Sequence, residues 1–85
     1  MKITLYVSDH CESCEQVLQY FKEKDLACEV VNVTYDQLMF DRMLSEGGIA
    51  TPFIVMEGQA FHVFDRDKIE AYLNTLKRDL NNEGG

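Results

Sequence analysis

The segment from Lys2 to Phe21 has the sequence KITLYVSDHCESCEQVLQYF, and the spacing of its apolar residues changes once along its length. Residues 2–8 alternate apolar and polar side chains, which is typical of a β-strand. From Cys14 onward the apolar residues recur at helical spacing, until the charged residues 22–25 end the pattern. The segment therefore predicts a strand, a short turn and a helix, with two cysteines where the helix begins.

The next two predicted elements are a strand and a helix. Residues 27–33 are rich in β-branched side chains and predict the strand. Thr34, with Gln37 three positions later, matches a capping box and predicts a helix that runs to about Glu46. A pair of glycines follows, and glycine adopts the left-handed conformation that commonly ends helices without a steric penalty.

After the only proline, the sequence predicts a hairpin and a last helix. Residues 53–56 and 60–64 predict short strands, and the tight turn at 57–59 means that they should pair antiparallel. Asp65 is a good N-cap for a helix whose apolar stripe comprises Ile69, Tyr72, Leu73, Leu76 and Leu80. The order βαβαββα predicts an α/β fold, in which a four-stranded mixed sheet is flanked by three helices.

Length and charge exclude several classes of protein. With 85 residues we expect one domain at 1–80 and a flexible tail at 81–85. A net charge of −7 repels phosphate backbones and anionic lipid, so nucleic acid is a poor candidate partner. No apolar run approaches the roughly 20 residues that span a bilayer, and we expect no secretion signal before the first strand. We therefore expect no membrane anchor, and the odd number of three cysteines favours the reducing cytoplasm. Nothing in the sequence suggests a large exposed apolar face, so we expect a monomer.

The chemistry is expected at Cys11-Glu12-Ser13-Cys14. Side chains three positions apart on a helix share a face, so the two sulfurs can form and break a disulfide with little backbone movement. Cys11 lies where the strand gives way to the helix, and the unpaired N–H groups and positive dipole end there favour a thiolate. Because the thiolate is the attacking species, Cys11 is the predicted nucleophile, and Cys14 is predicted to resolve the mixed disulfide.

Zinc sites use the same spacing of two cysteines, but a closed zinc site needs four ligands. The remaining candidate ligands, His10, Cys28 and His62, are single and scattered along the sequence, so no metal site is predicted. Cys28 is most simply interpreted as a small core residue.

These features resemble the thioredoxin superfamily and, within it, glutaredoxins and NrdH-type redoxins. The resemblance rests on the first strand, the helix that opens with Cys11-x-x-Cys14, and Thr51-Pro52 before the third strand, and it covers residues 2 to about 77. It implies a thioredoxin-like fold of glutaredoxin type and a thiol-disulfide oxidoreductase that needs no cofactor. It also implies that Pro52 is cis and lies beside the cysteines, while the backbone of Thr51 pairs with an extended substrate segment.

The residues with which glutaredoxins bind glutathione are only partly matched. Such glutaredoxins typically have a lysine three residues before the first cysteine, and a glycine pair followed by aspartate before the last helix. Here Ser8 stands in place of the lysine, and His62-Val63 stand in place of the glycine pair. Asp65 matches the aspartate, and at the start of the last helix it is expected to contact an amino group of the ligand. Phe64 falls near aromatic residues typical of NrdH-type redoxins, which are reduced by thioredoxin reductase. Glutathione and thioredoxin reductase therefore both remain candidate electron donors, and Val63, Phe64 and Asp65 are candidate substrate-binding residues.

The charges near Cys11 act in opposite directions. Asp9, Glu12 and Glu15 are close to it in sequence, and each carboxylate disfavours a thiolate. We expect them to offset much of the helix dipole's roughly 0.3–1 kcal/mol, which would leave the Cys11 thiol less acidic than in glutaredoxins generally. His10 would stabilise the thiolate and assist substrate binding as an imidazolium, or else is an ordinary solvated loop residue. The acidic surroundings favour a basic protein partner over free glutathione.

Taken together, the sequence predicts a small thiol-disulfide oxidoreductase that uses Cys11 and Cys14 to reduce protein disulfides. Two other classes are kept as alternatives. One is a metal or iron–sulfur carrier in which Cys11, or both cysteines, are ligands. The other is a redox-inert interaction module on the same scaffold.

Overall fold

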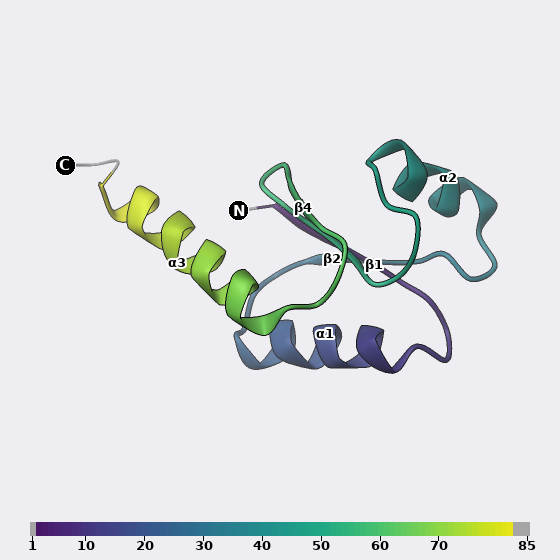
Figure 1. Cartoon of the computed structure of the whole chain (residues 1–85), viewed down its shortest axis with the longest axis horizontal. Helices are drawn as coiled ribbons and strands as arrows, with labels where there is room; N and C mark the ends of the chain where they lie inside the picture. Colours follow the sequence, from purple (N-terminus) through teal and green to yellow (C-terminus); the bar gives the residue numbers. More distant parts are fainter. Residues whose placement is uncertain (1, 83–85) are drawn as a thin grey trace.

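The computed structural model describes residues 2–82, with side chains for residues 2–78. Within this range the order of elements is the predicted βαβαββα (Figure 1). The elements are β1 (Ile3–Val7), α1 (Glu12–Glu23), β2 (Glu29–Asn32), α2 (Gln37–Ser45), β3 (Phe53–Met56), β4 (Gln59–Phe61) and α3 (Arg66–Asn82). None of the described helices is long and apolar enough to cross a membrane.

The strands form one mixed sheet in the order β2-β1-β3-β4. The central strand β1 is parallel to β2 and antiparallel to β3, with Leu5 opposite both Val30 and Ile54. The hairpin of β3 and β4 is antiparallel, as its short turn predicts. The opening βαβ unit therefore has parallel strands and the closing hairpin extends the sheet, as expected.

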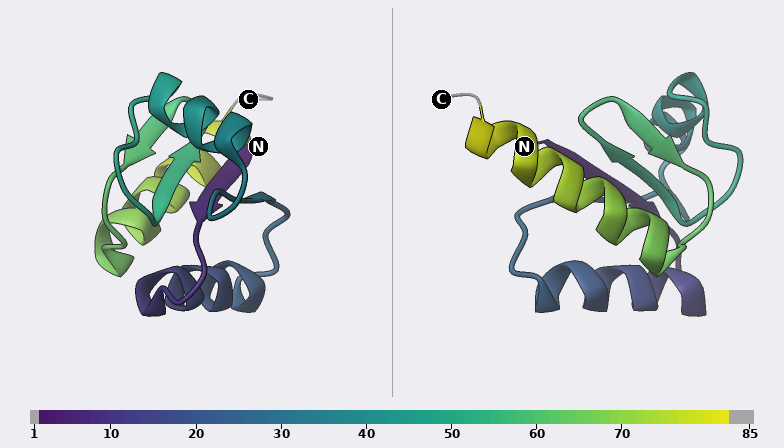
Figure 2. Two further views of the ribbon diagram at one scale, coloured as in Figure 1. Left: turned by 90° about the vertical axis from the view of Figure 1, so that its right-hand side faces the viewer. Right: turned by 60° about the vertical axis from the view of Figure 1, so that its left-hand side comes forward.

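Helices cover both faces of the sheet, as the two views of Figure 2 show. Ile3, Leu5 and Val7 of β1 belong to a buried cluster that includes side chains of α1 and α3. Tyr6 points to the other face, where a second cluster includes Met43 of α2. All five residues of β1 are consequently buried, although the sequence of the strand alternates. This rigid central strand leads directly into the loop that carries the cysteines.

The start of α2 differs from the prediction. Asp36, not Thr34, is the N-cap, and its carboxylate accepts a hydrogen bond from the backbone N–H of Met39 at 3.1 Å. The predicted capping box of Thr34 and Gln37 is therefore wrong. The hydroxyl of Thr34 instead accepts a hydrogen bond from the backbone N–H of Asp9, 25 residues away. The glycine pair ends the helix as expected, because Gly48 N–H donates to the carbonyl of Met43 at 3.0 Å.

Two strands are shorter than predicted and the last helix is longer. β2 covers Glu29–Asn32 rather than 27–33, and β4 ends at Phe61 rather than at residue 64. Phe61 pairs with Ile54, and the ladder ends soon after because Pro52 has no N–H to donate. α3 reaches Asn82 and so includes the first two residues of the predicted tail, while residues 83–85 of that tail lie outside the described part of the chain.

Tyr6 links the sheet to the end of α2 and makes the stability of the fold sensitive to alkali. Burial, together with the 2.5 Å hydrogen bond that its hydroxyl donates to the Glu46 carboxylate, raises the pKa of Tyr6 to about 12. A phenol in the unfolded chain has a pKa of about 10. The protonated phenol of Tyr6 therefore stabilises the fold in full below about pH 10, and this contribution is lost as the pH rises through about 12.

Tyr6→Phe is expected to reduce the loss of stability between pH 9 and pH 11, because the variant has no phenol to ionise at this position. Urea unfolding at both pH values gives the two free energies of unfolding to compare. Tyr35→Phe is the matched control and should show the decline of the unaltered protein, since Tyr35 is 93% exposed. An equal decline in the Tyr6 and Tyr35 variants would contradict the assignment.

Candidate active site

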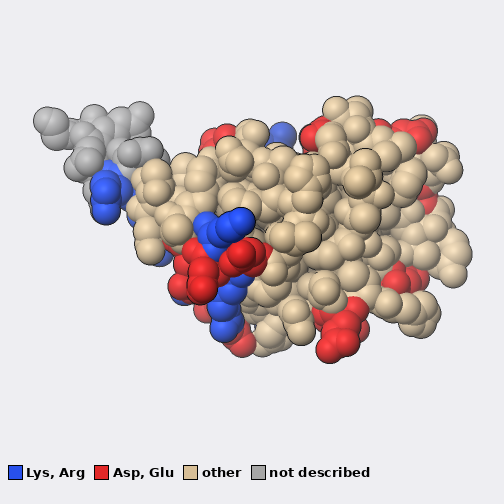
Figure 3. All heavy atoms as spheres, in the orientation of Figure 1, with Lys and Arg blue, Asp and Glu red and all other residues tan. Residues whose placement is uncertain are grey.

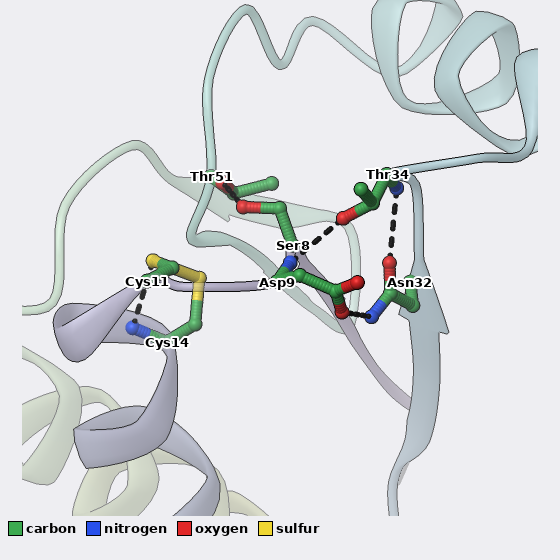
Figure 4. The surroundings of a disulfide bond; sticks show 7 residues. All are labelled: Ser8, Asp9, Cys11, Cys14, Asn32, Thr34 and Thr51. Carbon is green, nitrogen blue, oxygen red and sulfur yellow. Dashed lines mark hydrogen bonds between the residues drawn. A yellow bond between two sulfur atoms is a disulfide. The ribbon is translucent and has the colours of Figure 1, made fainter.

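The two cysteines of the motif lie at the start of α1, where the sequence places them (Figure 4). Their Sγ atoms are joined as a disulfide, with the Cα atoms 5.2 Å apart. Cys11 is the N-cap of the helix in an extended conformation, and its Sγ accepts a hydrogen bond from the backbone N–H of Cys14 at 3.1 Å. Cys14 is 1% exposed and belongs to the main core cluster, whereas Cys11 is half-buried.

This geometry makes the two sulfurs chemically unequal. The N–H group that points at the Cys11 sulfur and the positive end of the helix dipole both stabilise a negative charge there. The Cys14 side chain is almost fully buried against the core, which shields its sulfur from a large partner. The site thus provides one sulfur for attack from outside and a second sulfur one helical turn further in.

The loop between β1 and α1 is held by hydrogen bonds to two other segments, which are drawn in Figure 4. The Ser8 and Thr51 hydroxyls are 2.6 Å apart and hydrogen-bonded, so the cysteine loop is tied to the loop before β3. On the other side, the Asp9 backbone N–H donates to the Thr34 hydroxyl at 2.7 Å, and the Asn32 side chain donates to the Asp9 carboxylate at 2.9 Å. Sequence reasoning did not find this role for Ser8, Asn32 or Thr34, because the bonds join positions 23 to 43 residues apart.

A surface pocket of about 360 Å³ has both Cys11 and Cys14 in its lining. The polar side chains in its lining come from the β1–α1 loop, α1 and the end of β2, and they include Asp9, His10, Glu15 and Asn32. His10 is exposed, and its φ of 55° lies in the left-handed region that few residues other than glycine adopt. The predicted candidate His10 thus lines the same pocket as the two cysteines.

The other predicted substrate-binding residues are more dispersed. The Thr51-Pro52 peptide bond is cis, and the hydrogen bond from Thr51 to Ser8 joins this loop to the cysteine loop. Val63 is 67% exposed, whereas the ring of Phe64 packs edge-on against Tyr20 with centroids 5.5 Å apart. None of Val63, Phe64 and Asp65 lines the pocket that the two cysteines line.

Asp65 has the local role that the sequence predicts. Its carboxylate accepts a hydrogen bond from the backbone N–H of Lys68 at 3.2 Å and so caps α3.

The expected crowding of carboxylates around Cys11 needs one correction, because the Asp9 carboxylate points toward Asn32 and away from the disulfide (Figure 4). Among the described residues, no three histidine, cysteine or acidic side chains gather in a group that could hold a metal ion.

Acidic side chains occupy the end of the molecule where the β1–α1 loop lies. In Figure 3, which has the orientation of Figure 1, this right-hand end shows red acidic atoms and no blue basic atoms. Most of the visible basic side chains gather instead on the left, where acidic atoms lie among them, and another is visible at the top centre. A partner that approaches the disulfide on this face therefore meets a negative surface.

Comparisons with known proteins agree with this fold. The chain is similar to the thioredoxin-like protein BC3987, with a TM-score of 0.76 and 26% identity over 81% of this chain and 96% of that chain. It shares its fold with the glutaredoxin-like protein NrdH-redoxin from Escherichia coli, with a TM-score of 0.73 and 20% identity over 84% and 93% of the two chains. It also shares its fold with thioredoxin 1 from Thermosipho africanus, with a TM-score of 0.59 and 22% identity over the whole of both chains.

A search of curated proteins finds no match. The family model described as glutaredoxin matches residues 3–61, which include β1, the cysteine motif and the hairpin. The thioredoxin-like arrangement of three helices and a four-stranded mixed sheet, together with the Cys11–Cys14 pair, supports a redox function. The chain belongs to the glutaredoxin family.

Proposed function

We propose that this protein is a small thiol-disulfide oxidoreductase that reduces disulfides in partner proteins. The observation that carries the proposal is the unequal pair of cysteines at the start of α1. The sulfur of Cys11 is partly exposed and receives a backbone N–H, while that of Cys14 is buried within bonding distance. This is the arrangement that a two-step exchange of thiols and disulfides needs.

The reaction starts from the reduced protein. The Cys11 thiolate attacks one sulfur of the partner disulfide, and the other partner sulfur leaves as a thiolate that takes a proton from solvent. Cys14 then loses its proton to solvent and attacks the Cys11 sulfur, which releases the second partner sulfur. Two electrons have passed from the cysteine pair to the partner, and the disulfide of this structure is the product.

The neighbouring loops support the binding of an extended protein segment. The loop of Thr51 and Pro52 is joined to the cysteine loop through Ser8, which gives it a fixed position beside the site. We infer that the Thr51 backbone binds the partner segment and that the acidic surface favours a basic partner. Val63 is exposed enough to contact the same partner. We further propose that the protein acts as a monomer in the cytoplasm without a bound cofactor.

One experiment identifies whether glutathione or thioredoxin reductase is the electron donor. The oxidised protein would be mixed with NADPH and either glutathione plus glutathione reductase, or thioredoxin reductase alone. Oxidation of NADPH, followed by its absorbance, identifies the donor. We expect turnover with thioredoxin reductase, because Ser8 and Val63 stand where a lysine and a glycine would contact glutathione. Turnover with glutathione alone would contradict this expectation.

Failure with both donors would require two further measurements. An absorption band in the visible region of protein purified without oxygen would indicate the alternative role as an iron–sulfur carrier. A Cys11 thiol that does not react with a small alkylating reagent would indicate a redox-inert interaction module.

A further inference from the structure

The side chain of Asp9 is directed toward β2. The Asn32 side chain donates a hydrogen bond to the Asp9 carboxylate there, at 2.9 Å. Figure 4 shows this carboxylate on the side of the loop that faces β2, with the disulfide on the other side. An acidic residue only two positions before Cys11 is thus turned away from the reactive sulfur.

The amide of Asn32 is itself fixed by a second hydrogen bond. The backbone N–H of Thr34 donates to the side-chain oxygen of Asn32 at 2.9 Å. This bond assigns the oxygen end of the amide to Thr34, so the NH₂ end must face Asp9. The hydroxyl of Thr34 accepts from the Asp9 backbone at 2.7 Å, which closes a ring of three residues. The direction of the Asp9 carboxylate therefore depends on side chains from β2 and the turn after it.

The position of this carboxylate matters because a negative charge near a sulfur disfavours its thiolate. Other titratable groups lie close to Cys11 in the chain, and they are His10 in the same loop and Glu12 and Glu15 on α1. His10 and Glu15 also line the pocket that Cys11 lines. Two carboxylates on α1 thus remain close to Cys11 in sequence. Asp9 would add a third if its side chain turned toward the sulfur.

We propose that Asn32 is a positioning residue that holds the Asp9 carboxylate away from the Cys11 sulfur and so favours the attacking thiolate. Its effect on turnover rests on the proposed function, whereas its effect on ionisation does not. Asn32 touches neither sulfur in a hydrogen bond and acts through Asp9. The uncharged side chain of Asn32 thereby compensates in part for the acidic surroundings of the site.

The test measures the ionisation of Cys11 alone. All variants carry Cys14→Ser and Cys28→Ser, which leave Cys11 as the single thiol of a chain with three cysteines. Thiolate is followed by its ultraviolet absorbance as the pH is raised. Asn32→Ala is expected to lower the thiolate fraction at pH 6 about threefold, which is the size of effect a partly screened charge produces. Asn32→Asp keeps the shape of the side chain but removes the NH₂ donor, and should lower the fraction as well.

A second substitution separates charge from loop structure. Adding Asp9→Asn to Asn32→Ala removes the carboxylate, and is expected to restore the thiolate fraction although the ring of hydrogen bonds stays broken. Gln37→Ala is the matched control, because Gln37 donates an amide hydrogen bond of the same 2.9 Å length to Asp41 on α2. It should leave the titration unchanged.

The proposal is overturned if both Asn32 variants titrate like the parent, or if the loss of thiolate persists after Asp9→Asn is added. The measurement needs no partner disulfide, so it is independent of the proposed function. Suppose that the Asn32 variants lower the thiolate fraction of Cys11 as expected, but the unaltered protein reduces no disulfide. The proposed function would then be wrong, while the positioning role of Asn32 would stand.

Discussion

Replacing Cys11 with serine is expected to abolish the reduction of protein disulfides, with a rate at least about 1000-fold below that of the unaltered protein. A serine hydroxyl is not ionised at neutral pH, so the N–H of Cys14 would have no thiolate to stabilise at this position. The core is disturbed little, because Cys11 is only half-buried and a hydroxyl can still cap the helix. Reduction of insulin by the protein, with dithiothreitol as donor, measures the loss.

Cys14→Ser is the informative contrast. The attack by Cys11 is retained in this variant, but nothing displaces the partner afterwards, so a stable mixed disulfide between Cys11 and the partner should accumulate. Electrophoresis without reducing agent would show it, and mass spectrometry would locate it. If Cys11→Ser kept full activity, or if Cys14→Ser formed no mixed disulfide, the roles assigned to the two sulfurs would be wrong.

The second large effect is expected in the core beneath the loop of Thr51 and Pro52. A Cβ atom placed on Gly48 would lie 2.6 Å from the Phe53 ring and 2.8 Å from the Met43 side chain. Phe53 and Met43 are fully buried, so neither can move without disturbing the cluster under α2. Gly48→Ala is expected to lower the free energy of unfolding by about 1–3 kcal/mol, which is the usual cost of overpacking.

Thermal or urea unfolding would measure this loss, and two variants test its cause. Gly58→Ala is a control without a steric clash, because no atom lies within 4 Å of its Cβ position and only its φ of +82° opposes a side chain. Combining Gly48→Ala with Phe53→Leu removes part of the ring and should recover some of the stability. If this double variant were as unstable as the sum of its parts, the clash with Phe53 would not be the cause.

Most elements of the fold are predictable from the sequence because their signals are local. The alternation in residues 2–8 and the helical spacing after Cys14 each reflect one face of one element. The start of α2 was placed wrongly because Thr34 and Asp36 are both good N-cap residues, two positions apart. The choice between them depends on Asp9, whose backbone uses the hydroxyl of Thr34.

In the candidate site too, the sequence predicts local features but not contacts between distant residues. Cys11, Cys14 and Pro52 are recognisable from a motif and its spacing, whereas the contributions of Ser8 and Asn32 are not. These two residues act through hydrogen bonds to partners 43 and 23 positions away, which only the assembled sheet brings together. The direction of the Asp9 side chain was missed for that reason, since composition records its charge but not where the charge lies.

The central place of β1 in the sheet has a consequence for synthesis on the ribosome. This strand is made before the other three, yet it pairs with β2 on one side and β3 on the other, and Ile3 pairs with Met56. A nascent chain can form the parallel pair once residue 32 has emerged, but it must then wait for the hairpin before the sheet is closed. During this interval one edge of β1 has no neighbouring strand, and an unpaired strand edge of this kind is prone to pair with other chains.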